Sequence, residues 1–298
     1  MSTTSVSFVA GSSKVNCSEF AAGKSAVIEH VGPAPRIAIE RQGHGPLVVF
    51  LHGIGGNRAN WHDQLRAFAG EFTAVAWDAR GYGDSDDYEG ALRFEDFSAD
   101  LLRVLAYVGA RRAHLVGLSM GGRIALDFYG RHPEQVASLV LADTSVAMPS
   151  GPDREAHVSA ILADRQRPLL GGKTLAEIAP ALARGLASSR ISPERLALLQ
   201  QSVAELHKDS YLKTLEAVTR YEGFPPLGSV RAPCLVVVGS EDRIAPVDVA
   251  RLTAAAIPGA QLEIIGDAGH VSNLEKPEAF NAVVLKFLRG VETGGRYA

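Results

Sequence analysis

Continuous apolar runs alternate with segments of helical periodicity along most of this chain. The run Pro46–His52 (PLVVFLH) is apolar without a break, as in a strand that is covered on both faces of a parallel sheet. Phe94–Val108 shows the other pattern, because its apolar residues recur at intervals of three and four. This alternation predicts right-handed βαβ units, and therefore an α/β fold with a mostly parallel central sheet flanked by helices.

The same two patterns predict the other elements of the sheet and its helices. Further strands are expected at Ala26–Val31, Arg36–Glu40, Phe72–Asp78, Ala113–Leu118, Val136–Ala142, Cys234–Gly239 and Gln261–Ile265. Further helices are expected at Asn60–Ala69, Gly122–Gly130, Val247–Ala256 and Pro277–Leu288.

Between about Val146 and Leu227 the alternation stops, and helical patterns follow one another without a strand. The helices expected there are Arg154–Asp164, Thr174–Leu186, Pro193–His207 and Tyr211–Tyr221. A helical block that interrupts an α/β chain is typical of an inserted cap. The sequence therefore divides into an N-terminal extension (1–25), a first part of the core (26–146), a helical cap (147–229) and a second part of the core (230–298).

The composition is that of an ordinary globular protein. Of 298 residues, 46% are apolar and 21% charged, and the formal net charge is −3. These values exclude a disordered or fibrous chain and give no electrostatic reason to expect nucleic acid or an anionic membrane as a partner. No apolar run reaches the roughly 18 residues of a membrane span, and Met1–Lys24 lacks the pattern of a secretory signal. Cys17 and Cys234 have no CxxC or His/Cys cluster near them, which favours a reducing, cytoplasmic location.

Ser119 stands in a G-x-S-x-G sequence between an expected strand and an expected helix. A serine nucleophile needs a sharp turn with a strained backbone, and small residues on both sides let strand and helix approach each other. The N-terminus of the following helix presents free N–H groups to the negative charge of an acyl-transfer intermediate. A glycine-rich turn with an incidental serine is the alternative interpretation, and the strand before and the helix after argue against it.

A serine hydroxyl needs a base and an orienting carboxylate. His270 follows the strand Gln261–Ile265, and Asp242 follows the strand Cys234–Gly239, so both stand where the strands of a parallel sheet end. The order Ser119, Asp242, His270 is the order that follows a serine elbow. Taken singly, Asp242 could be a turn or capping aspartate and His270 a surface histidine. The other candidate carboxylates are Asp143, Glu241, Asp267 and Glu275, and we place Asp242 ahead of them.

The loop His52-Gly53-Ile54-Gly55-Gly56 follows the first long strand. Its Ile54 N–H, together with that of Met120, is the expected donor pair of an oxyanion hole. The same loop also resembles a dinucleotide-binding fingerprint, since Gly53, Gly55 and an acid at Asp78 have nearly the right spacing. Arg58 occupies the place of the third glycine, which weakens that alternative.

Together these motifs resemble the α/β-hydrolase fold superfamily. The matching landmarks are His52-Gly53, Asp78-Ala79-Arg80-Gly81-Tyr82-Gly83-Asp84-Ser85, Gly117-Leu118-Ser119-Met120-Gly121-Gly122, Gly239-Ser240-Glu241-Asp242 and Gly269-His270. The resemblance covers Ala26–Thr144 and Arg231–Leu288, and the run GLSMGG is similar to that of enol-lactone hydrolases and small carboxylesterases. Haloalkane dehalogenases and epoxide hydrolases carry aspartate at the position of Ser119, so the resemblance does not extend to them.

The resemblance implies a cofactor-free serine hydrolase that cleaves a carboxylic ester or lactone through an acyl-enzyme. C–C hydrolysis of ring-cleavage products, perhydrolysis by a cofactor-free haloperoxidase and a receptor without turnover remain alternatives. We expect a small-molecule substrate, no metal, no nucleic acid and no membrane, and a monomer or homodimer. Pocket-lining candidates are Trp61, Met120, Met148 and Val271. The cap arginines are expected mostly on a solvated face, although one could bind a substrate carboxylate; they are Arg154, Arg165, Arg167, Arg184, Arg190, Arg195 and Arg220.

Overall fold

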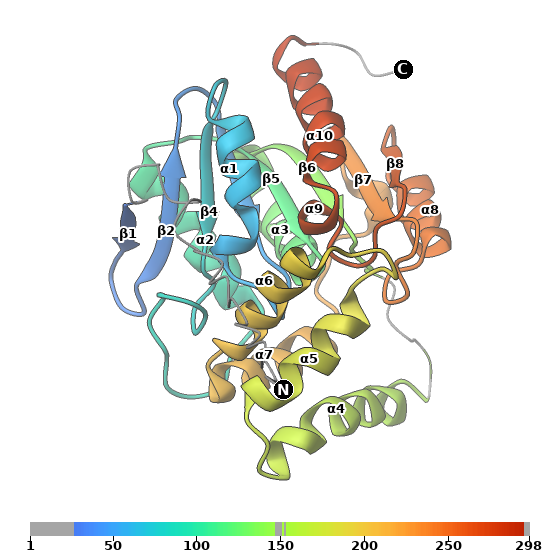
Figure 1. The fold of residues 1–298 in the computed structure, drawn as a ribbon. Coiled ribbons are helices and arrows are strands. Elements are labelled where there is room, and N and C mark those ends of the chain that lie inside the picture. Colours follow the sequence, from blue (N-terminus) through green and yellow to red (C-terminus); the bar gives the residue numbers. More distant parts are fainter. Residues whose placement is uncertain (1–26, 147–150, 152, 295–298) are drawn as a thin grey trace, which may run out of the picture.

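An eight-stranded sheet runs through the centre of the protein (Figure 1). In this computed structural model the described residues are 27–146, 151 and 153–294. The expected N-terminal extension and Met148 lie outside them. The strands are β1 (Ile28–Val31), β2 (Ile37–Gln42), β3 (Leu47–Leu51), β4 (Thr73–Trp77), β5 (Ala113–Leu118), β6 (Val136–Ala142), β7 (Cys234–Gly239) and β8 (Gln261–Ile265).

The strand order is β1-β2-β4-β3-β5-β6-β7-β8. The pairs β1–β2 and β2–β4 are antiparallel, and every pair from β4 onward is parallel. The prediction of a mostly parallel α/β sheet is therefore confirmed. Because the strands from β4 to β8 run in one direction, the loops after them meet at a single edge of the sheet.

Helices cover both faces of the sheet. They are α1 (His62–Phe68), α2 (Glu95–Val108), α3 (Met120–Arg131), α8 (Val247–Ala256), α9 (Ser272–Glu275) and α10 (Pro277–Glu292), with short 3-10 turns η1 (Arg58–Trp61), η2 (Pro133–Gln135) and η3 (Leu227–Ser229). The single-turn helix α9 was not expected from the sequence. It begins two residues after His270.

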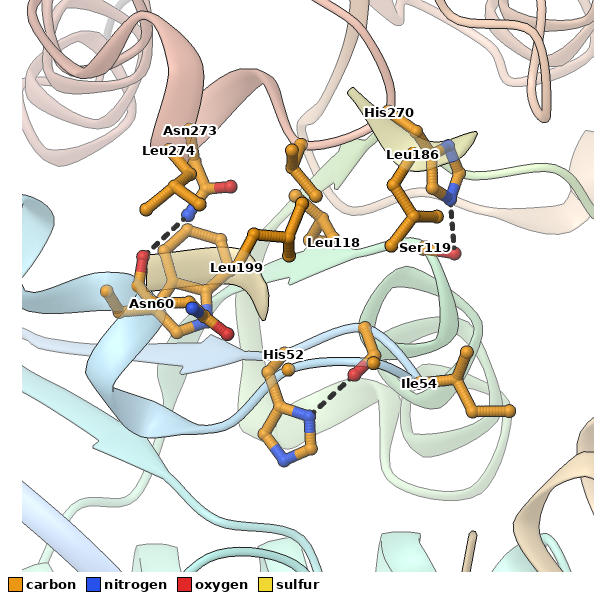
Figure 2. A pocket seen from close by; sticks show the side chains of 15 residues that line it. His52, Ile54, Asn60, Leu118, Ser119, Leu186, Leu199, His270, Asn273 and Leu274 are labelled. Carbon is orange, nitrogen blue, oxygen red and sulfur yellow. Dashed lines mark hydrogen bonds between the residues drawn. The ribbon is translucent and has the colours of Figure 1, made fainter. Parts of the chain in front are cut away.

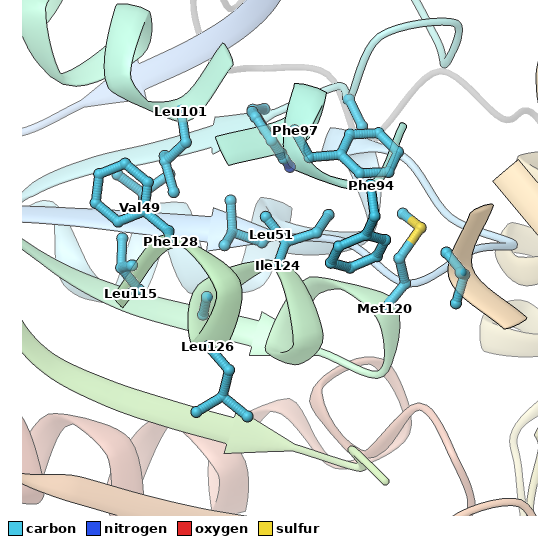
Figure 3. Close-up of a cluster of buried hydrophobic side chains, with 14 of the residues drawn as sticks. Val49, Leu51, Phe94, Phe97, Leu101, Leu115, Met120, Ile124, Leu126 and Phe128 are labelled. Atoms are coloured by element: carbon cyan, nitrogen blue, oxygen red, sulfur yellow. The ribbon is translucent and has the colours of Figure 1, made fainter. Parts of the chain in front are cut away.

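The apolar strands divide their side chains between two buried clusters. Along β3, Val49 and Leu51 enter one cluster with α2 and α3, shown in Figure 3, whereas Val48 and Phe50 enter the other with α1 and α10. Alternate residues of a strand point to opposite faces, so a strand buried on both faces has to be apolar throughout. This is the physical reason for the unbroken apolar run in the sequence.

Four helices connect β6 to β7 and gather at one end of the sheet (Figure 1). They are α4 (Arg154–Leu170), α5 (Leu175–Leu186), α6 (Pro193–Ala204) and α7 (Lys208–Arg220). We call these four helices the cap. Helix α4 continues past the expected end at Asp164, because Leu169 extends the buried face formed by Val158 and Leu162. Pro168 lies in its last turn, so the one N–H···O=C hydrogen bond that it removes is near the end of the helix.

Within the described ranges, no helix combines the length and the apolar character that crossing a bilayer requires.

Candidate active site

Ser119 occupies a sharp turn between β5 and α3. Its backbone has φ 54° and ψ −111°, a conformation that costs energy for any residue with a side chain. The turn is possible because its flanks are glycines. A Cβ on Gly117 would collide with the backbone of Gly121, and one on Gly121 would collide with the carbonyl of Leu51. Helix α3 begins at Met120, two residues before the expected start, so its N-terminus lies directly beside the serine.

The structure brings Ser119, His270 and Asp242 into one hydrogen-bonded series. Ser119 Oγ lies 2.9 Å from His270 Nε2, and His270 Nδ1 lies 2.8 Å from Asp242 Oδ2. The other carboxylate oxygen, Oδ1, accepts hydrogen bonds from the N–H groups of Ile244 and Ala245 at 2.8 and 3.0 Å. Both His270 and Asp242 are 5% exposed. An ionised Asp242 holds the Nδ1–H tautomer of His270, which leaves Nε2 free to accept the serine proton.

Asp143, the first rival for the role of orienting carboxylate, binds elsewhere. Its Oδ2 accepts from the N–H and the hydroxyl of Ser272 at 2.9 and 2.7 Å, and its Oδ1 accepts from Gly239 N–H at 2.8 Å. It therefore connects the end of β6 to β7 and to the residues that follow His270. Complete burial raises the pKa of Asp143 to about 6, the positive charge of His270 opposes this rise, and the negative charge of Asp242 adds to it.

The other rival carboxylates connect the α5–α6 loop of the cap to the site. Glu275 accepts from the N–H of Gly269 at 2.9 Å and from that of Ser188 at 3.1 Å. Glu241 accepts from Ser189 N–H at 2.9 Å. The N–H of His270 itself donates to the carbonyl of Leu186 at 2.8 Å. Asp267 forms a surface ion pair with Arg190 at 3.1 Å.

The loop after β3 is held with its Ile54 N–H unengaged. His52 accepts the N–H of Ala79 on Nε2 at 3.0 Å, so its Nδ1 carries the proton that Gly53 O accepts at 2.8 Å. The Tyr82 hydroxyl donates to Ile54 O at 3.2 Å. In the described part of the chain, no hydrogen bond engages the N–H of Ile54 or of Met120. The geometry leaves both donors available to a developing oxyanion.

The dinucleotide alternative finds no support in the structure. Asp78, the acid of the near-fingerprint, forms an ion pair with Arg58, the residue at the place of the third glycine. Asp78 also accepts the N–H of Arg58 at 2.7 Å and that of Asp84 at 2.9 Å. The acid that would hold a ribose is therefore used within the fold. Among the described residues, no group of His, Cys, Asp or Glu side chains is placed to hold a metal ion.

An apolar cavity opens on one side of Ser119. Its lining includes Leu186 and Leu199 of the cap and Leu118 and Leu274 of the core (Figure 2). Two of the expected lining residues, Trp61 and Val271, lie in its wall. Trp61 is 1% exposed and stacks on Phe50 with ring centroids 5.1 Å apart, so it also belongs to the core.

A second cavity, which we call the polar cavity, also borders Ser119. Met120 lines it, as expected, together with Ile54 and His270. The further lining residues are Arg123, Ser145, Ile161, Arg165, Val218, Thr219, Ile244 and Ala245. Arg165 was one of the cap arginines considered from the sequence. Arg123 was not, although its position four residues after Ser119 puts it on the same face of α3. Leu186 and Leu199 could not be assigned, because the sequence does not show how the cap packs on the core.

Residues 46–277 match the sequence model of the family described as alpha/beta hydrolase fold. The chain belongs to this family. The α/β-hydrolase is 30% identical to the 2-hydroxy-6-oxononadienedioate/2-hydroxy-6-oxononatrienedioate hydrolase of Burkholderia vietnamiensis, over 91% of this chain and 97% of the relative. It is 24% identical to 3-oxoadipate enol-lactonase 2 of Acinetobacter baylyi, over 82% of this chain and 88% of the relative.

A solved structure similar to this α/β-hydrolase is that of a thermophilic esterase from Thermogutta terrifontis with malate bound. The two are 27% identical with a TM-score of 0.78, over 89% of this chain and 99% of the esterase. The relatives are hydrolases that cleave different bonds. They support hydrolysis as the general activity of this chain, together with the resemblance to enol-lactonases.

Proposed function

We propose that this α/β-hydrolase cleaves a carboxylic ester or a lactone, with Ser119, His270 and Asp242 as its catalytic triad. The observation that carries the proposal is the unbroken series of hydrogen bonds from Asp242 through His270 to Ser119. The free N–H group of Ile54 belongs to the loop after β3 and that of Met120 to the first residue of α3, and both residues line the polar cavity beside the serine. These are the nucleophile, the base, the orienting acid and the oxyanion donors that acyl transfer requires.

The reaction follows from this geometry in two halves. Ser119 Oγ attacks the carbonyl carbon while His270 Nε2 takes the hydroxyl proton, and the N–H groups of Ile54 and Met120 stabilise the oxyanion. When the tetrahedral intermediate collapses, the bond to the leaving oxygen breaks and His270 returns its proton to that oxygen. A water molecule then attacks the acyl-enzyme by the same proton transfers, which releases the acid and restores Ser119.

The similarity to an enol-lactonase and to an esterase supports this choice. Hydrolysis of a C–C bond in a ring-cleavage product is the second candidate, because the relative at 30% identity over 91% of this chain is named for such a substrate. The two candidates use the same catalytic residues and differ in the bond that the substrate presents.

The experiment compares the wild-type protein with Ser119→Ala on methyl and p-nitrophenyl esters of increasing chain length, on a panel of small lactones and on a 2-hydroxy-6-oxodienoate. Loss of the nucleophile is expected to lower kcat on esters or lactones by at least roughly 10⁴-fold. Ser159→Ala is the matched control, since Ser159 is an exposed serine of the cap whose hydroxyl binds Glu155.

Hydrolysis of an ester or lactone that Ser119→Ala abolishes and Ser159→Ala preserves would support the proposal. Turnover of the dienoate alone would replace it with the second candidate. If the folded wild-type protein hydrolyses none of these compounds, or if Ser119→Ala retains the activity, the proposal is wrong.

A further inference from the structure

Arg123 is a buried cation that no described carboxylate pairs with. It lies one turn into α3 from Ser119 and is 7% exposed. Its guanidinium makes one long hydrogen bond, from Nη2 to the carbonyl of Tyr221 at 3.4 Å, and lies 5.0 Å from the ring centre of Phe224. The buried Nε has no hydrogen-bond partner in the described part of the chain. Burial lowers the pKa of Arg123 to about 10, so the group is still charged at neutral pH.

The fold supplies acids to its other enclosed arginines. Arg80, whose side chain is 13% exposed, binds both oxygens of the buried Asp100 at 2.6 and 2.7 Å. The Arg58 guanidinium forms ion pairs with two acids, Asp78 and Asp84. An enclosed guanidinium is unfavourable unless its charge and its N–H donors are matched. No acid among the described residues forms an ion pair with Arg123, so within this part of the chain its charge is left without a counter-ion.

The cavity that Arg123 faces is the polar one beside Ser119. Arg165 of α4 also lines this cavity, and no described carboxylate pairs with it. Its neighbour Arg167, in contrast, is bound to Asp164 at 2.7 Å. Among the described residues the cavity lining has no Asp or Glu, and its remaining polar side chains are Ser119, Ser145, Thr219 and His270. Two guanidinium groups without an acid favour an anion in this cavity.

We propose that the polar cavity binds a free carboxylate of the substrate through Arg123, with Arg165 as the second cation. The inference rests on the proposed function and names its substrate class: esters or lactones that carry a carboxylate on one side of the scissile carbonyl and an apolar group on the other. The apolar group fits the apolar cavity, where Leu118, Leu186 and Leu199 contribute the lining. A carboxylate bound by two N–H donors also fixes which carbonyl reaches Ser119.

The test uses pairs of esters that differ only in a terminal carboxylate. On the acyl side the pairs are monomethyl glutarate with methyl valerate and monomethyl adipate with methyl hexanoate. On the alcohol side the pair is 3-acetoxypropanoate with propyl acetate. We expect the wild-type enzyme to prefer the carboxylate member of at least one pair by roughly 100-fold in kcat/KM. Arg123→Gln should abolish this preference, since the interaction of Arg123 with the bound carboxylate is the one removed.

Several variants control this test. Arg123→Lys keeps the charge and should retain part of the preference, and Arg165→Gln should reduce it by a few fold. Arg167→Gln is the matched control on α4, because Arg167 is exposed, points to Asp164 and is absent from the cavity lining. Circular dichroism and thermal melting establish that each variant folds. If Arg123→Gln does not fold, Arg165→Gln tests the same site by a substitution at an exposed residue.

Equal rates on both members of every pair would overturn the inference while leaving the ester hydrolase intact. If Arg123→Gln lowers kcat/KM equally for both esters of a pair, the inference is also overturned, because that result indicates a structural role for Arg123. If no ester is hydrolysed, the proposed function fails, and calorimetric titration with glutarate decides the subsite by itself. Binding to wild type that Arg123→Gln abolishes supports the subsite, and absence of binding to wild type rejects it.

Discussion

The core and the cap contribute to the surroundings of Ser119 in different ways. In the core, the polar groups next to the serine are bound at fixed positions: His270 and Asp242 lie 2.8 Å apart, and the Asp242 carboxylate is also held by backbone N–H groups. From the cap come the apolar side chains of Leu186 and Leu199 on one side, and Arg165, which has no ion pair among the described residues, on the other.

This difference separates the chemistry from the choice of substrate. Acyl transfer needs donors, acceptors and a base that are already in place, and strand ends in a buried sheet supply such positions. Selection among substrates needs a surface whose size and charge can change without moving the catalytic groups, and helices inserted between two strands supply it. We therefore expect substitutions in the core to change kcat on all substrates, and substitutions in the cap to change which substrates are used.

The largest effect should come from Asp242→Asn. The variant can still accept the N–H groups of Ile244 and Ala245, so the loop is kept, but it no longer stabilises the Nδ1–H tautomer and the positive charge of His270. We expect kcat to fall by roughly 10³- to 10⁴-fold on every substrate. Steady-state kinetics on esters of different chain length, with circular dichroism to establish folding, measure this effect.

Asp143→Asn is the matched comparison, since Asp143 is a second buried aspartate near the same histidine. It should lower kcat by no more than about tenfold, because Asp143 binds Ser272 and Gly239 and does not contact His270 Nδ1. A larger loss in this variant than in Asp242→Asn would make Asp143 the orienting acid and would contradict the assignment.

The pH dependence of stability should report on Asp143. Its folded pKa of about 6 is higher than the usual value of 3.8, so between these pH values the folded protein holds a proton that the unfolded chain has lost. The free energy of unfolding then decreases as pH rises from about 4 to 6, by up to about 3 kcal/mol from this group. Asp143→Asn lacks this proton. Urea unfolding of both proteins at several pH values should show that the free energy of unfolding of the wild type falls relative to that of Asp143→Asn as pH rises. A difference that does not change with pH would contradict the raised pKa.

The smallest effect is expected in the cap. Leu199 is 2% exposed and lines the apolar cavity, so Leu199→Ala should enlarge the space for the substrate. We expect kcat/KM for esters that are one or two carbons longer to rise by about tenfold relative to short esters. This is the size of effect that one or two methylene groups have on kcat/KM when they fill a hydrophobic pocket. The adjacent Leu198 is 46% exposed, and Leu198→Ala should leave the chain-length profile unchanged. The same shift in both variants would show that the cavity does not select the substrate.

Much of the architecture could be predicted because it depends on local patterns. The strands Ala113–Leu118, Val136–Ala142, Cys234–Gly239 and Gln261–Ile265 were predicted with the bounds that the structure gives them, since each is a short apolar run between turn residues. Helix ends were less accurate. Helix α4 extends beyond Asp164 because the burial of Leu169 against the rest of the protein outweighs the effect of Pro168, and no local pattern records that contact.

The sequence by itself determined the order of strands and helices, the glycines that allow the turn at Ser119, and the places of Asp242 and His270 at the ends of strands. These features follow from periodicity and from backbone sterics, which act over a few residues. Only the tertiary structure decided that Asp242 rather than Asp143 contacts His270, and that Arg123 lies beside the serine without an acid. Such pairings join residues far apart in the chain, and they depend on how the sheet twists and how the cap packs, neither of which leaves a periodic trace in the sequence.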